Sequence, residues 1–287
     1  MSSMKEMLVK GTFINALGFF ISVIINILTV YFFVRIFSLS EYGFFVFANI
    51  FTAIGLLGIF DFGVPSSMMR EISADLKLKN FRAAKNVFWF SIIFLLIVGV
   101  LSASILSILS SIIFTIGDMD LDYSDYVYCL FLSNVFSFPT LALKSTFNAL
   151  HKFQFNQVVQ IIGDGFKLFG TFLIFYNDLN SNYIFFLILI HSIFIFLLYI
   201  LYLDPLFKQN LLTVNFKSGG EAIFKLSGLI SVQRIGAVVY TNSDKFFGAL
   251  LLGSTGVAII DLFSKIPLLF NRVLGVATST LLPVISG

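Results

Sequence analysis

The sequence predicts an all-α, polytopic membrane protein with about eight transmembrane helices. Of its 287 residues, 58% are hydrophobic, only 11% are charged, and 38 are phenylalanines. The mean hydropathy is +0.99. A soluble domain of this length would have about a quarter of its residues charged, and it could not hide this much apolar surface from water. The composition therefore excludes the water-soluble classes of protein.

Eight apolar stretches are each long enough to cross a bilayer as a tilted helix. They cover residues 12–36, 43–68, 86–116, 126–150, 158–176, 183–203, 226–249 and 255–281. The first is too long for a cleavable signal peptide, so we expect it to be retained. Residues 1–205 then form an N-terminal six-helix bundle, and residues 226–287 form the first hairpin of a second bundle. Residues 206–225 combine Lys and Phe with Gly219-Gly220, which predicts a cytoplasmic interfacial linker with a hinge.

Charges in the loops predict the orientation of the bundle. One set of loops carries Lys5, Lys10, Arg70, Lys77, Lys79, Arg82, Lys85, Lys152, Lys208, Lys217 and Lys225. The opposite set carries Arg35, with Lys245 at the edge of a stretch, and the acidic run Asp118, Asp120, Asp122 and Asp125. Cytoplasmic loops of membrane proteins are enriched in Lys and Arg. We therefore predict that both termini lie in the cytoplasm.

Apart from Arg35 at the end of the first stretch, ten Asp, Lys and Arg residues lie within the apolar stretches. They are Asp61, Lys144, Asp164, Lys167, Arg234, Asp244, Lys245, Asp261, Lys265 and Arg272. Charges at membrane depth are normally tolerated only where they face a bundle interior or a water-filled cavity, and there they often mark a substrate or ion pathway. A transport route is the first hypothesis.

Polar side chains recur at helical spacing, which places them on one face of five stretches. The faces consist of Asn15, Ser22, Asn26 and Thr29; Ser133, Ser137, Thr140, Lys144 and Asn148; Gln157, Gln160, Asp164, Lys167 and Thr171; Arg234, Thr241 and Lys245; and Asp261, Lys265 and Arg272. Five aligned polar faces predict a wet internal cavity. The stretches 86–116 and 183–203 lack such a face, and we expect them to face lipid.

The polar faces also have a structural interpretation. Single Ser, Thr and Asn residues in transmembrane helices often form hydrogen bonds between helices. Asp164 and Lys167 can compensate each other at their helical spacing, and Asp261 with Lys265 forms a similar pair. Snorkelling to the interface explains one or two lysines. The whole basic set favours a functional cavity.

Two segments resemble a known family. The first is FVRIFSLSEYGFFVFANIFTAIGLLGIFDFGVPSSMMREIS, with its LSxxEYG turn, its DFG and the following Arg70-Glu71. The second is YTNSDKFFGALLLGSTGVAIIDLFSKIPLL, with Asp244-Lys245, Gly253, Gly256 and Lys265. Both are similar to Wzx-type polysaccharide flippases of the multidrug/oligosaccharidyl-lipid/polysaccharide exporter superfamily. The resemblance covers essentially the whole chain, and it implies a fold like that of multidrug and toxin extruders, truncated after the first hairpin of the second bundle.

The resemblance implies a flippase in the bacterial cytoplasmic (inner) membrane that moves a polyprenyl-diphosphate-linked oligosaccharide by alternating access. We expect the head group to meet a basic cavity, formed by Lys144, Lys167, Arg234, Lys265, Arg272, Asn26 and Asn148. Ion-coupling or charge-partner roles fall to Asp164, Asp244, Lys245 and Asp261. The expected partners are the lipid-linked oligosaccharide, the bilayer, and the polysaccharide polymerase with its chain-length machinery, and no nucleic acid.

Two other classes stay open at this point. An ion-coupled multidrug antiporter of the same fold would have an acidic or aromatic pocket, and the basic excess argues against it. A membrane-embedded polymerase or glycosyltransferase needs catalytic side chains in a substantial loop, and here the outer loops are short. The sequence has two His and one Cys, and no Cys/His cluster indicates a metal or cofactor. We expect a transporter without enzymatic activity.

Overall fold

The computed structural model describes residues 2–116, 124–207 and 214–285, and all regular secondary structure in these residues is helical. This confirms the predicted all-α class. In chain order the elements are α1 (Ser2–Ile36), α2 (Leu39–Ile50), the 3₁₀ helix η1 (Leu56–Asp61), α3 (Val64–Lys77), α4 (Phe81–Ile116), α5 (Ser124–Ala149), α6 (Phe153–Tyr176), α7 (Tyr183–Leu201) and α8 (Phe216–Ile285).

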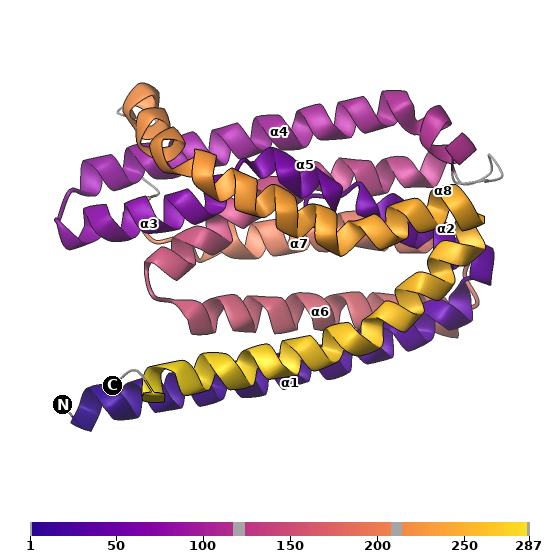
Figure 1. Ribbon diagram of the computed structural model, residues 1–287, viewed down its shortest axis with the longest axis horizontal. Coiled ribbons are helices and arrows are strands. Elements are labelled where there is room, and N and C mark those ends of the chain that lie inside the picture. The colour runs from indigo at the N-terminus through magenta and orange to yellow at the C-terminus, as the bar shows by residue number, and fades with distance from the viewer. Residues whose placement is uncertain (1, 117–123, 208–213, 286–287) are drawn as a thin grey trace.

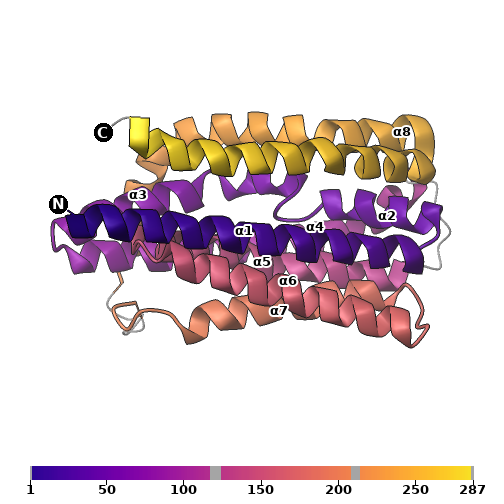
Figure 2. The same ribbon diagram turned by 90° about the horizontal axis from the view of Figure 1, so that it is seen from below.

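The long helices run side by side along the long axis of the molecule (Figures 1 and 2). Helix α8 consists of two arms that meet at Gly253, where a φ of 67° and a ψ of −169° interrupt the helix. The turn lies at the end of the molecule opposite the start of α1, and the second arm returns to the end where α1 begins (Figure 1). The two arms correspond to the predicted stretches 226–249 and 255–281. In the described residues, six helices are long and apolar enough to cross a membrane.

The predicted single span 43–68 is wrong, because the structure divides it into α2, η1 and α3. Phe62 and Gly63 both adopt the left-handed conformation, with φ values of 49° and 69°. Gly63 tolerates this conformation because it has no Cβ, and Pro65 suits the first turn of the α3 that follows. The Gly63 N–H also donates to Asp61 Oδ1 at 2.7 Å, which closes the turn. The segment was apolar enough for one helix, but its backbone turns twice.

The LSxxEYG motif forms the entry to α2. Ser38 and Glu41 form a reciprocal capping box, in which Ser38 Oγ accepts from the Glu41 N–H and Glu41 Oε2 accepts from the Ser38 N–H. Ser181, before α7, donates to the other oxygen of Glu41 at 2.9 Å. Gly43 lies against the backbone of Ser254, just after the α8 turn, and a Cβ there would overlap the Ser254 carbonyl. The motif therefore begins α2 and joins it to α7 and α8.

Asn134 on α5 holds the break between α2 and η1. Its Oδ1 accepts from the Ala53 N–H at 2.9 Å, and its Nδ2 donates to the Phe51 carbonyl at 3.1 Å. Both Asn134 and Ala53 are fully buried. Because backbone groups inside a membrane protein need partners, this side chain takes the place of the missing helical hydrogen bonds.

Replacing Asn134 with leucine is expected to destabilise the protein strongly. Leucine keeps the size of the side chain but leaves two backbone groups without partners, at about 1–3 kcal/mol for each group. The measurement is thermal unfolding of the purified protein in detergent. The matched control is Asn177→Leu, since Asn177 is exposed and its side chain donates to the Leu173 carbonyl of its own helix at 2.8 Å. Equal losses of stability in the two variants would contradict the role of Asn134.

The predicted linker is partly helical, because α8 begins at Phe216. Asn215 accepts from the Ser218 N–H at 3.2 Å and so caps the helix. Gly219 packs directly on α4, where a Cβ would overlap the carbonyl oxygen of Asn86. The predicted hinge at Gly219-Gly220 is therefore wrong: both glycines are helical, and Gly219 allows close packing between helices.

Apolar side chains are divided between the interior and the outer surface. Two buried clusters, around Phe44 and Phe131 and around Met68 and Phe138, pack the helices together. Large apolar residues are exposed along the outer faces, especially on α4, where they include Leu96, Ile97, Val100, Leu101, Ile105 and Ile108. This distribution suits a lipid-facing surface.

Candidate functional site

A cavity of about 530 Å³ lies between α1, α2, α5, α6, α7 and α8. The unwound segment after α2 contributes Thr52, Ala53, Ile54 and Gly55 to its wall. Irregular backbone at membrane depth is found where it lines a cavity, and broken helices often line the binding sites of transporters. The non-helical segment that interrupts the predicted span 43–68 is thus part of the cavity wall.

Part of each predicted polar face lines this cavity. On α5, Ser133, Ser137, Thr140 and Lys144 all line the wall. Asn26 and Thr29 face it from α1, and Gln160 and Lys167 face it from α6. Lys245, Asp261 and Lys265 contribute from the two arms of α8. The alignment at 3.6 residues per turn was therefore a sound signal for the interior of the bundle.

The expectation that 183–203 faces only lipid is wrong. Helix α7, which forms this stretch, lines the cavity through Ile188, His191, Ser192, Ile195 and Tyr199. Ser137 on α5 donates to Ser192 across the helix interface at 3.4 Å. Polar periodicity did not indicate this wall, because three of its five residues are Ile or Tyr.

Asp164 forms a polar layer with two amides at the α1–α6 interface. Asn26 Nδ2 donates to its Oδ2 at 3.2 Å, and Gln160 Nε2 donates to its Oδ1 at 3.1 Å. Asp164 is buried. Both hydrogen bonds to its carboxylate thus come from amide groups, whereas the helical spacing predicted Lys167 as the partner of Asp164. Lys144 and Lys167 both lie on the cavity wall near this layer.

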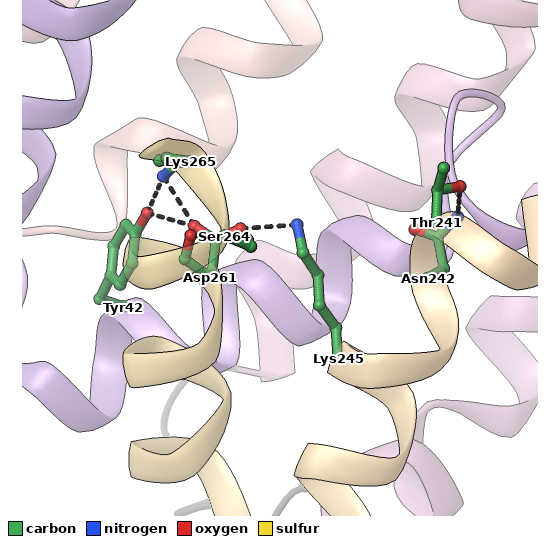
Figure 3. A network of polar contacts seen from close by, with 7 residues as sticks. All are labelled: Tyr42, Thr241, Asn242, Lys245, Asp261, Ser264 and Lys265. Carbon is green, nitrogen blue, oxygen red and sulfur yellow. Dashed lines mark hydrogen bonds and ion pairs between the residues drawn. The ribbon is translucent and has the colours of Figure 1, made fainter. Parts of the chain in front are cut away.

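A second polar cluster joins α2 to both arms of α8 (Figure 3). Asp261 Oδ2 lies 2.7 Å from Lys265 Nζ, which confirms that predicted pair. Its Oδ1 lies 2.6 Å from Lys245 Nζ, so Lys245 pairs with Asp261 across the α8 turn. The Tyr42 hydroxyl donates to Asp261 Oδ2 at 2.7 Å. Asp244, expected to act as a charge partner or ion-coupling residue, is exposed and is not on the cavity wall.

Three of the predicted binding residues are not placed on the described cavity wall. Arg234 Nε lies 3.4 Å from Asp61 Oδ2, so it joins α8 to the turn before α3. Asn148 Oδ1 accepts from Asn156 Nδ2 at 2.6 Å, linking α5 to α6. The side chain of Arg272 lies outside the described part of the chain.

Several wall residues lie outside the predicted polar faces, above all Tyr42. The only sequence signal for Tyr42 was its position in the LSxxEYG turn, because its distance from Asp261 in the chain hides their contact. Among the described residues, no group of three or more His, Cys, Asp or Glu side chains could hold a metal ion.

Comparison with protein families assigns the chain. The model of the family described as "Polysaccharide biosynthesis protein" matches residues 8–287. The chain belongs to this family. A search of curated proteins returned no match. The expected link to polysaccharide biosynthesis is confirmed at the level of the family.

Solved structures of transporters share the fold of this polysaccharide biosynthesis family member. A MOP superfamily transporter from Pyrococcus furiosus matches with a TM-score of 0.71 and 16% identity, over 95% of this chain and 62% of the transporter. An inward-facing multidrug resistance MATE family transporter of the MOP superfamily matches with a TM-score of 0.62 and 16% identity, over 88% of this chain and 64% of that one. The chain thus spans less than two thirds of each of these transporters, and it is a multi-pass membrane protein with their fold.

Proposed function

We propose that the protein is a flippase that moves a polyprenyl-diphosphate-linked oligosaccharide from the inner to the outer leaflet of the bacterial cytoplasmic membrane. The family supplies the link to polysaccharide biosynthesis, and the fold supplies the link to transport. The lining of the cavity supports the class of substrate. Alternating access then carries the head group through the cavity, while the polyprenyl tail stays in lipid.

The observation that carries this proposal is the charge of the cavity. Four lysines line its wall: Lys144, Lys167, Lys245 and Lys265. One buried carboxylate, Asp261, lies on the same wall, and a second, Asp164, lies behind the wall within electrostatic reach of Lys144 and Lys167. Counting both carboxylates leaves a formal excess of two positive charges. A diphosphate cannot cross hydrocarbon without replacing its hydration, and lysines replace it with charge-assisted hydrogen bonds. The excess of positive charge therefore favours an anionic head group.

The polar rows of the cavity suit a sugar. Ser133, Ser137 and Thr140 offer hydroxyl groups along α5, and Asn26 and Gln160 offer amides from α1 and α6. Hydroxyl and amide groups can both donate and accept hydrogen bonds, as sugar hydroxyls do. We assign Lys144, Lys167 and Lys265 to the diphosphate, with Lys245 as a further donor from the first arm of α8, and Asn26 to the glycan. Arg234, with its partner Asp61, and Asn148, with its partner Asn156, are assigned to helix packing.

The runner-up is an ion-coupled multidrug antiporter of the same fold. One structural neighbour is a multidrug resistance transporter, and the other is described through the reverse polarity of its binding pocket. Pocket charge thus varies on this fold, so the lining residues must decide the ligand. Cationic drugs would meet the excess of lysines unfavourably, which favours the anionic substrate.

The test reconstitutes the purified chain in liposomes. One probe is a fluorescent polyprenyl diphosphate that bears N-acetylglucosamine, and the other is the cation ethidium. We expect movement of the polyprenyl probe between leaflets above the rate in empty liposomes, and no accumulation of ethidium. Movement of ethidium alone would support the antiporter, and movement of neither probe would also contradict the proposed function.

We further propose that both termini lie in the cytoplasm. The start of α1 and the end of α8 lie at the same end of the molecule, which supports a common side (Figure 1). Reporters fused after Gly287 or within residues 70–85 are expected to be cytoplasmic, and a reporter within residues 117–125 is expected outside. A cytoplasmic signal from residues 117–125 would reverse the orientation.

A further inference from the structure

One buried carboxylate is shared by three side chains from three helical segments (Figure 3). Asp261 pairs with Lys245 at 2.6 Å and with Lys265 at 2.7 Å. The Tyr42 hydroxyl donates to the same carboxylate and accepts a hydrogen bond from Lys265 Nζ. Asp261 is only 4% exposed, while both lysine side chains are partly exposed on the cavity wall. Two cavity lysines therefore use one buried carboxylate as their ion-pair partner.

The same carboxylate ties α2 to both arms of α8. Tyr42 lies in the first turn of α2, Lys245 on the first arm of α8, and Asp261 on the second arm. The ties cluster near the α8 turn, where the backbone of Ser254 lies against Gly43. We call the four side chains Tyr42, Lys245, Asp261 and Lys265 the Asp261 latch. The latch joins α2 to the hairpin that the two arms of α8 form.

We propose that Asp261 is an internal counter-ion that the anionic group of the substrate displaces, so that substrate binding opens the Asp261 latch. This inference rests on the proposed function, since it takes the diphosphate as the anion. In the empty cavity, Asp261 offsets part of the charge of Lys245 and Lys265. When phosphate oxygens bind the two lysines, Asp261 loses its ion pairs, and Tyr42 loses the network that holds α2 against α8.

Competition for the lysine donors supplies the driving force. Each lysine has three N–H donors and no acceptor, and the carboxylate of Asp261 already takes the donors that point toward it. A diphosphate has more charge and more acceptor oxygens than one carboxylate, so it can replace Asp261 with several charge-assisted hydrogen bonds. A ligand shifts a conformational equilibrium only when it binds the two states differently. Here the substrate binds most tightly where the latch is open.

The first experiment measures binding of inorganic pyrophosphate to the purified full chain at low ionic strength, where charge screening is weak. Asp261→Asn keeps the size of the side chain but removes the competing charge. If Asp261 is a displaced counter-ion, this variant binds pyrophosphate about tenfold more tightly than the wild type, the equivalent of about 1.4 kcal/mol. If Asp261 instead holds the lysines in place for the ligand, the variant binds equally or more weakly. That result would overturn the inference.

Asp204→Asn is the matched control for the first experiment. Asp204 also pairs with a lysine, Lys152, at 3.1 Å, but this pair lies away from the cavity wall. We expect pyrophosphate affinity to stay at the wild-type value in this variant. An increase equal to that of Asp261→Asn would mean that overall charge causes the effect, and it would overturn the inference.

The second experiment measures the release of α2 from α8. Its variant, Tyr42→Phe, keeps the ion pairs of both lysines, so this experiment decides the question even if Asp261→Asn does not fold. Hydrogen exchange of residues 39–50 is measured with and without pyrophosphate. In the wild type, pyrophosphate is expected to speed exchange in α2. In Tyr42→Phe, exchange in α2 is expected to be fast already and insensitive to pyrophosphate. Slower or unchanged exchange in the wild type on adding pyrophosphate would overturn the inference.

Tyr128→Phe is the matched control for the second experiment. Its hydroxyl also joins two helices, through a 3.2 Å hydrogen bond with Ser110, but it is not on the cavity wall. This variant is expected to keep the wild-type response of α2. Loss of the response in both variants would mean that removal of any interhelical hydroxyl is sufficient, which contradicts a specific role of Tyr42.

The outcomes separate this inference from the proposed function. Pyrophosphate binding with neither tighter binding by Asp261→Asn nor a response of α2 overturns the latch, and an anion-binding cavity remains. Absence of pyrophosphate binding in the wild type and in Asp261→Asn overturns the latch. If the polyprenyl probe also fails to move in liposomes, the proposed function fails as well.

Discussion

Replacing Gly43 with alanine is expected to cause the largest loss of stability among single substitutions in α2. The added methyl group would overlap the carbonyl oxygen of Ser254 and come within 2.5 Å of its carbonyl carbon, so a backbone must shift. Adding atoms to a well-packed interior typically lowers the free energy of unfolding by about 1–3 kcal/mol. A clash with backbone is expected to cost about 3 kcal/mol or more, because backbone atoms cannot move aside as a flexible side chain can. The measurement is the thermal unfolding of the detergent-purified protein, together with its folded yield.

Gly236→Ala is the control for this substitution. Gly236 lies in the first arm of α8, and no heavy atom lies within 4 Å of the position of its added Cβ. Alanine at an open helical position is expected to be neutral or to stabilise the helix by up to about 1 kcal/mol. If Gly43→Ala unfolds at the same temperature as Gly236→Ala, then close packing of α2 on the α8 turn does not support the fold.

Neutralising single cavity lysines is expected to remove most of the transport. Hydrogen bonds to charged groups contribute about 1.5–3 kcal/mol, which corresponds to about a 10- to 100-fold slower rate at limiting substrate. The variants are Lys144→Gln and Lys167→Gln, and the measurement is the initial rate of the polyprenyl probe at equal amounts of protein. Folded yield is expected to stay near the wild type. Lys77→Gln, on the exposed side of α3, is the control and should keep the wild-type rate.

Double variants separate substrate binding from structural pairing for these lysines. A purely structural role predicts that removing one charge leaves its partner uncompensated and lowers the amount of protein. It also predicts recovery when both charges are removed. Wild-type transport by Asp164→Asn with Lys167→Gln, and by Asp261→Asn with Lys265→Gln, would show that these lysines are only structural. We expect both double variants to fold and to remain slow.

Hydropathy and helical periodicity predicted most of the fold because the bilayer enforces them. A helix that crosses lipid must be long and apolar, and polar side chains must gather on its inner face, so α5 could be read from Ser133 to Lys144. The break after α2 escaped prediction, because hydropathy averages over residues and does not sense backbone conformation. The left-handed turn at Phe62 and Gly63 depends on Asp61 and on packing against α8.

Contacts between residues far apart in the chain also could not be predicted from the sequence. The spacing of Asp261 and Lys265 on one helix revealed their pair, but Tyr42 lies 219 residues from Asp261. Asn134 likewise bonds to the backbone of a segment 81 residues away. The apolar composition of α7 hid its place on the cavity wall, because polar periodicity cannot identify a wall made mainly of Ile and Tyr side chains.

The most direct test of the account is an experimental structure of the protein with the polyprenyl diphosphate that bears N-acetylglucosamine. The account predicts phosphate oxygens within about 3 Å of the Nζ atoms of at least two of Lys144, Lys167 and Lys265, with the sugar along the polar row of α5. Phosphate groups bound outside this cavity, with Lys265 still paired to Asp261 and Lys144 free of contact with the ligand, would contradict the assignment of the basic cavity to the diphosphate.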